Sequence, residues 1–126
     1  MNREVKIKTI LLSIKPEFVE KIQSGEKRFE YRKKLPKQKF TRVIIYASRP
    51  IQRIIGEFQV GAIYSESPEK LWRLTSNHSG IDKTFFDAYF HGCEIAHAIR
   101  INDFHAYPEP RLLPHGIMAP QSFRYI

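Results

Sequence analysis

The chain has 126 residues, of which 42% are hydrophobic and 13% aromatic, enough apolar material for one domain with a buried core. Its formal net charge is +8, and the excess is uneven: residues 1–53 contain 15 Lys and Arg against 5 Asp and Glu, whereas residues 54–126 contain 6 against 8. The composition excludes disordered and low-complexity classes and predicts one domain over residues 1–126 with a basic face.

The first elements are a strand and a short helix. Residues 7–14 carry the alternating apolar pattern of a strand. Lys15-Pro16 opens a helix, because proline suits the first helical turn, and Gly25 ends it, because glycine suits the turn that follows a helix.

The next strand is expected over 27–33 and carries charges between aromatic residues. Its alternation places Phe29 and Tyr31 on one side and Glu30 and Arg32 on the other. A carboxylate beside cationic groups serves either as an ion pair that supports the fold or as an acid or base in a polar cleft. The residues alone leave both interpretations open.

Downstream, short strands and helices follow in runs. Strands are expected over 42–47, 54–63 and 95–104, with one helix after Ser67-Pro68 and another after Asp82. Beyond Tyr107 we expect a proline-rich loop that ends in a last strand over 122–126. This order, without regular strand–helix alternation, predicts an α+β fold around a small curled sheet or barrel.

The helix after Asp82 carries an aromatic stripe. We expect the stripe to pack against the sheet as core rather than to form a ligand site. Its members are Phe85, Phe86, Tyr89 and Phe90.

The pattern Gly25-x-Lys27-x-x-Glu30-x-Arg32, after a helix opened by Lys-Pro, resembles the signature of the ASCH domain, a branch of the PUA-like superfamily. Further segments match in order along nearly the whole chain: 11–16, 46–50, 55–58, 89–92, 96–99 and 120–123. The resemblance implies a small PUA-like β-barrel of about five to six strands with flanking short helices. It also implies a cleft lined by the Lys-x-x-Glu-x-Arg segment.

The resemblance leaves several functions open. Small bacterial ASCH proteins include N4-acetylcytidine amidohydrolases, ribonucleases and RNA-binding modules. Of the amidohydrolase residues, Lys27 matches the lysine, but Glu30 stands where that group has a threonine, and 77–80 contains no carboxylate. Our main expectation is therefore a domain that binds RNA or a modified nucleotide. The alternatives are a hydrolase acting on a modified nucleoside or on single-stranded RNA, and a regulatory module for a small ligand.

Ten residues form the candidate site. In a binding module, Glu30 would accept hydrogen bonds from a base, and Lys27 and Arg32 would meet phosphate or carbonyl oxygens. In an enzyme, Lys27 would stabilise an oxyanion and Glu30 would move the proton. The remaining candidates are three polar residues from family-like segments, Ser48, Gln121 and Ser122, and a basic loop that either is simply solvated or anchors phosphates: Lys33, Lys34, Lys37 and Lys39.

We expect no cofactor and no metal. Cys93 is the single cysteine, the five histidines lack metal-ligand spacing, and no glycine-rich phosphate loop occurs. The apolar runs are too short to span a membrane, and the polar start over 1–6 does not resemble a secretory signal, so a cytoplasmic protein is expected. The sequence does not predict an oligomeric state.

Overall fold

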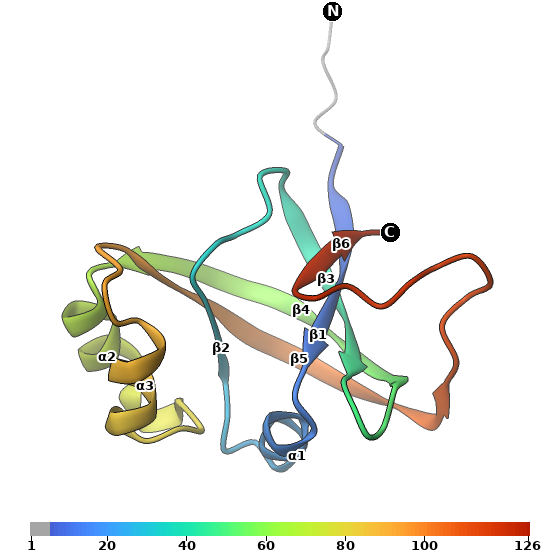
Figure 1. Cartoon of the computed structure of the whole chain (residues 1–126), viewed down its shortest axis with the longest axis horizontal. Coiled ribbons are helices and arrows are strands. Elements are labelled where there is room, and N and C mark those ends of the chain that lie inside the picture. The colour runs from blue at the N-terminus through green and yellow to red at the C-terminus, as the bar shows by residue number, and fades with distance from the viewer. Residues whose placement is uncertain (1–5) are drawn as a thin grey trace, which may run out of the picture.

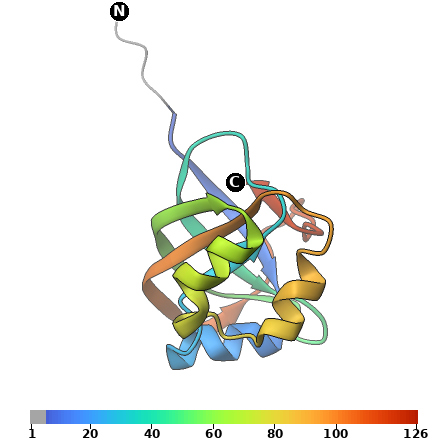
Figure 2. The same ribbon diagram turned by 90° about the vertical axis from the view of Figure 1, so that its left-hand side faces the viewer.

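The computed structural model describes residues 6–126 and shows one curled, half-barrel sheet with three short α-helices (Figures 1 and 2). The sheet has six strands in the order β2-β5-β4-β3-β1-β6, which confirms the predicted α+β class. The elements are β1 (Lys8–Ile14), α1 (Pro16–Ser24), β2 (Phe29–Arg32), β3 (Phe40–Ala47), β4 (Arg53–Glu66), α2 (Pro68–Thr75), the 3₁₀-helix η1 (Ser76–His78), α3 (Lys83–Tyr89), β5 (Ala96–Arg111) and β6 (Phe123–Tyr125).

The core of the half-barrel is formed by β1, β3 and β4. β1 pairs in parallel with β3, and the other neighbouring strands are antiparallel. Ile10, Val43, Ile45 and Phe58 are completely buried between these strands, and α1 covers them with Val19 among others. Full burial of such side chains stabilises each by about 1.5–3 kcal/mol relative to exposure.

The helix ends follow the predicted signals. Gly25 adopts a φ of +84° after α1, and its backbone N–H donates a hydrogen bond to the carbonyl oxygen of Ile22. The Ser67 hydroxyl accepts a hydrogen bond from the backbone N–H of Lys70 at the start of α2, and the Asp82 carboxylate accepts one from Phe85 at the start of α3. Both caps satisfy N–H groups that lack a partner within the helix.

The proline-rich loop expected after Tyr107 is partly wrong, because β5 continues to Arg111. Gly56 pairs with Ala106 and Ile54 with Arg111, so four residues of β5 lie opposite one residue of β4. Two of the four are prolines, which a bulge tolerates because its residues need not donate to the ladder.

The aromatic stripe of α3 is only partly core. Phe86 and Phe90 are buried in a second apolar cluster with Leu71 of α2, as predicted. Phe85 is 41% exposed, which corrects its assignment to the core. The physical reason is that α3 covers the end of the sheet with one face only, so successive positions on the helix cannot both point inward.

Within residues 6–126, no helix is both long and apolar enough to cross a membrane. The polar start on which the argument against a secretory signal depends falls mainly on residues 1–5, outside the described part of the chain.

Candidate functional site

An open pocket of about 280 Å³ lies beside β2, and we call it the β2 pocket. Segments distant in sequence form it: the end of β1, α1, β2, the turn after β3, α3 and the segment before β6. Its lining residues are Ser13, Ile14, Lys15, Phe18, Lys27, Glu30, Tyr31, Arg32, Ser48, Ile81, Phe85, Tyr89 and Gln121.

Lys27 is buried at one side of the pocket, with 2% of its surface exposed. Its Nζ donates a hydrogen bond to the carbonyl oxygen of Ser79 at 2.9 Å. The same ammonium lies 4.8 Å from the ring centre of Tyr31 and 5.4 Å from that of Phe18. Burial lowers the pKa of Lys27, and the nearby Glu30 carboxylate opposes part of this shift.

Glycine at position 80 leaves room for this lysine. Gly80 has a φ of +69°, and a Cβ there would lie 2.5 Å from the Cβ of Lys27. Because the backbone between η1 and α3 comes so close to the Lys27 side chain, only glycine fits at this position.

Glu30 is the buried carboxylate of the site. It is 5% exposed, and its Oε2 has no hydrogen-bond partner among the described residues. The same oxygen lies 4.0 Å from Nη2 of Arg32, at the outer limit of an ion pair. A buried carboxylate oxygen without a partner is rare in a folded protein, and here it belongs to a residue that lines the pocket.

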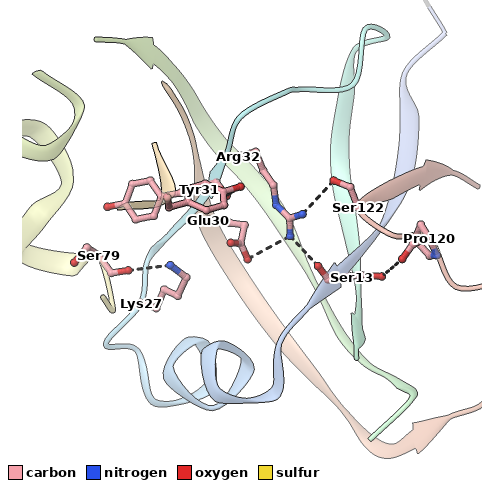
Figure 3. A network of polar contacts seen from close by, with 9 residues as sticks. Ser13, Lys27, Glu30, Tyr31, Arg32, Ser79, Pro120 and Ser122 are labelled. Carbon is pink, nitrogen blue, oxygen red and sulfur yellow. Dashed lines mark hydrogen bonds and ion pairs between the residues drawn. The ribbon is translucent and has the colours of Figure 1, made fainter. Parts of the chain in front are cut away.

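Arg32 joins the two edges of the curled sheet (Figure 3). Its Nη2 donates to the carbonyl oxygen of Ser13 on β1 at 2.8 Å, and its Nη1 donates to the Ser122 hydroxyl at 3.2 Å. Because β2 is one edge strand and Ser122 immediately precedes β6 at the other, the guanidinium spans the seam of the half-barrel. Its Nε has no partner among the described residues.

Aromatic hydroxyls complete the polar setting. Burial raises the pKa of Tyr31 to about 12, and its hydroxyl shares a 2.7 Å hydrogen bond with Thr75. Burial also raises the pKa of Tyr89. The Nζ atom of Lys33 lies over the Tyr89 ring, 4.9 Å from the ring centre. Both phenols stay neutral near pH 7.

The structure brings together five of the ten residues predicted from the sequence. Lys27, Glu30, Arg32, Ser48 and Gln121 line the β2 pocket. Ser122 does not line it but holds Arg32.

The four lysines of the basic loop do not line the pocket themselves. Lys33 and Lys34 are exposed, and the ammonium of Lys33 lies over the ring of Tyr89, which does line it. Lys37 and Lys39 border a separate, shallow hollow between the loop and β4.

Sequence reasoning missed several members of the pocket. Ser79 contributes a backbone carbonyl, which no side-chain pattern reveals. Ser13 also contributes its carbonyl to Arg32, although its position before Ile14-Lys15-Pro16, inside a family-like segment, was a usable signal. Phe85 and Tyr89 belonged to the stripe assigned to the core.

No group of three His, Cys, Asp or Glu side chains within residues 6–126 is placed to hold a metal ion. One histidine makes a notable contact, because Nδ1 of His97 lies 2.7 Å from the Ser65 hydroxyl on the neighbouring strand. This pair is outside the β2 pocket.

Comparison with known sequences supports the resemblance seen in the motif. The family model for the ASCH domain matches residues 12–105. An ASCH domain-containing ribonuclease of Zymomonas mobilis is 32% identical over 97 residues, which are 76% of this chain and 66% of that protein. The large ribosomal subunit protein uL22 of Ureaplasma parvum is 29% identical over 128 residues, covering 99% of this chain and 41% of that protein. The chain thus spans less than half the length of this relative.

Solved structures agree on the fold. The crystal structure of ASCH from Zymomonas mobilis has a TM-score of 0.86 at 28% identity, covering 94% of this chain and 87% of that one. The N-terminal domain of McrB from Staphylothermus marinus has a TM-score of 0.50 at 14% identity and shares the fold alone.

Proposed function

This chain belongs to the ASCH domain family. We propose that it is a ribonuclease that cleaves single-stranded RNA in the β2 pocket. One observation carries the proposal: a buried ammonium, a buried carboxylate with an unpartnered oxygen and a guanidinium line the same open pocket. The similarity to an ASCH domain-containing ribonuclease supports it, because RNA is the substrate that this relative's name states.

The size of the pocket favours a single-stranded substrate. A volume of about 280 Å³ is near the lower limit of small-molecule sites, roughly 300 Å³, and suits one nucleotide. Bases of single strands and loops can be splayed out into such a pocket, whereas paired bases cannot.

We assign the reacting groups as follows. The Glu30 carboxylate takes the proton from the ribose 2′-hydroxyl, and the 2′-oxygen forms a bond to the adjacent phosphorus. The bond from phosphorus to the 5′-oxygen breaks, and the Lys27 ammonium gives its proton to that oxygen. The lowered pKa of Lys27 makes its ammonium a stronger acid than an exposed lysine. The products are a 2′,3′-cyclic phosphate and a free 5′-hydroxyl.

Arg32 and three other polar residues complete the site. The Arg32 guanidinium, which lines the pocket, stabilises the negative charge on the phosphate. Ser48 and Gln121, which also line the pocket, contact the nucleotide, and Ser122 positions Arg32. The four lysines of the basic loop steer the RNA backbone toward the pocket. They act through their charge and do not contact the reacting atoms.

The test is incubation of the protein with a single-stranded RNA and with DNA of the same sequence, followed by analysis of product ends. We expect cleavage of RNA to cyclic-phosphate ends and none of DNA, because DNA lacks the 2′-hydroxyl. The same assay on duplex RNA should give much slower cleavage.

Two outcomes would contradict the proposal. RNA that binds and stays intact would favour a pure binding module, and equal cleavage of DNA would exclude attack by the 2′-hydroxyl. A parallel incubation with N4-acetylcytidine tests the nucleoside hydrolase, which would release acetate from the nucleoside and leave RNA intact.

A further inference from the structure

Four aromatic rings line the β2 pocket, and three of them already lie beside a lysine ammonium of the protein. Phe18 and Tyr31 both lie near the ammonium of Lys27, at 5.4 and 4.8 Å. The ring of Tyr89 lies 4.9 Å from the ammonium of Lys33. No ammonium or guanidinium group of the described residues lies over the fourth ring, that of Phe85.

Phe85 is also the most exposed of the four. It is 41% exposed, whereas Phe18 and Tyr89 are half-buried and Tyr31 is 5% exposed. Its one aromatic contact in the described chain is with Phe18, at 5.5 Å between ring centres and an angle of 73°. An edge-to-face contact of this kind leaves ring surface of Phe85 open to a ligand.

The helix that carries Phe85 is fixed in place. Asp82 caps the start of α3 by accepting a hydrogen bond from the backbone N–H of Phe85 itself. The next residue, Phe86, is completely buried and contacts Trp72 and Phe90 with ring centres 4.9 and 4.8 Å apart. The ring of Phe85 is thus held at the pocket by a rigid element rather than by a mobile loop.

The fold uses only part of the Phe85 ring, which contacts Phe18 while 41% of the residue remains exposed. An exposed ring beside a cationic pocket is the arrangement that single-stranded nucleic acids use, with bases on aromatic faces and phosphates near cations.

We propose that Phe85 is the stacking platform for the nucleobase of the nucleotide bound in the β2 pocket. The inference rests on the proposed function for its substrate class and adds the residue that holds the base. Because every base has a π-face, stacking on Phe85 predicts tolerance for base identity at this position, with purines favoured by their larger area.

The experiment measures base stacking separately from cleavage. Short single-stranded RNAs carry 2-aminopurine at one position, on a 2′-deoxy sugar that prevents internal attack there. Stacking on an aromatic ring quenches 2-aminopurine fluorescence. We expect the wild-type protein to quench the label and Phe85→Tyr to quench it similarly. Phe85→Ala and Phe85→Leu should weaken binding roughly 5- to 150-fold and abolish the quench.

The matched control is Leu74→Ala, which truncates another exposed apolar side chain, 52% exposed on α2 and outside the pocket lining. It should bind and quench as wild type. All variants should still unfold in one cooperative thermal transition, with a small decrease of the midpoint in Phe85→Ala from the lost contact with Phe18.

The inference is overturned if Phe85→Ala or Phe85→Leu binds and quenches as the wild type does. It is also overturned if the wild type binds labelled RNA without quenching at any label position. A wild type that quenches but cleaves no RNA supports the stacking residue while contradicting the ribonuclease, so the two failures are distinguishable.

Discussion

Lys27 holds a positive charge where water hardly reaches, with one hydrogen bond to the Ser79 carbonyl and two aromatic rings around it. Burial disfavours the charged form of Lys27 and lowers its pKa, so an apolar side chain of similar length removes this desolvation cost. For Lys27→Met we therefore expect the free energy of unfolding in urea to stay unchanged or to rise by about 1 kcal/mol. RNA cleavage should be lost. A fall in stability of more than about 2 kcal/mol would instead identify Lys27 as a structural support.

The same residue predicts a pH dependence of stability. Burial lowers the pKa of Lys27 in the folded protein, whereas the unfolded chain keeps an ordinary value near 10.5. Between these two values the unfolded state binds more protons, so the contribution of Lys27 to stability rises with pH. The difference in unfolding free energy between wild type and Lys27→Met should shift in favour of the wild type as pH rises toward 10.5. A difference that stays constant with pH would contradict the burial of the ammonium.

Gly80 offers a test of the position of Lys27, with Gly25 as a matched control. Both have a positive φ, +69° and +84°, so alanine is strained at either. Only at Gly80 would the added Cβ meet Lys27, since nothing lies within 4 Å of a Cβ at Gly25. Each substitution should lower the unfolding free energy by about 1 kcal/mol or more. Only Gly80→Ala should also reduce kcat for RNA, and equal losses of kcat would contradict this account.

At the scale of elements, Arg32 ties β2 to the opposite edge of the sheet. Arg32→Lys keeps the charge but cannot reach the Ser13 carbonyl and the Ser122 hydroxyl together. We expect a loss of about 1–2 kcal/mol in unfolding free energy and faster amide hydrogen exchange in β6. Arg73→Lys, on the exposed face of α2, should change stability by less than about 0.5 kcal/mol. Unchanged exchange in β6 would show that Arg32 does not hold the seam.

The elements also show where sequence patterns suffice. The helix over Pro16–Ser24 could be predicted because proline, apolar spacing and Gly25 all act within one segment. The path of β5 through two prolines could not be predicted, because it depends on a bulge in the pairing of β5 with β4. Such a bulge depends on how two distant segments align and not on the local sequence of either. The exposed Phe85 was missed for a related reason: helical spacing identifies an apolar face but not which part of it the sheet covers.

In the candidate site, too, some residues could be predicted from the sequence and others could not. Lys27, Glu30 and Arg32 lie within six consecutive residues, so their common location followed from the motif. The residues that fix them, Ser13, Ser79 and Ser122, come from segments up to 90 positions from Arg32, and two of them act through backbone carbonyls. Their contribution depends on the closure of the half-barrel and could only be seen in the structure.

At the scale of the whole molecule, the charge of the chain predicts how RNA binding depends on salt. Residues 26–42 contain eight Lys and Arg against two Glu, which concentrates the surplus on β2 and its loop. Each phosphate neutralised on a single strand changes the slope of log affinity against log salt by about 0.7. Replacing Lys33, Lys34, Lys37 and Lys39 by Gln should reduce that slope and weaken binding at low salt.

Cleavage of saturating RNA by this four-fold variant should keep the wild-type kcat, because none of the four lysines lines the pocket. A control that replaces Lys70 and Lys83, on α2 and α3, should leave the salt slope nearly unchanged. An unaltered slope in the four-fold variant would show that the basic loop does not contact RNA.

In the proposed reaction the carboxylate of Glu30 accepts the proton of the ribose 2′-hydroxyl in the β2 pocket, and Glu30→Gln tests this role most directly. The amide keeps the shape but cannot accept the proton, so kcat for single-stranded RNA should fall roughly 10²- to 10⁴-fold while RNA affinity changes little. Glu20→Gln, on the exposed side of α1, should cleave as the wild type does. Cleavage by Glu30→Gln at the wild-type rate would contradict the account.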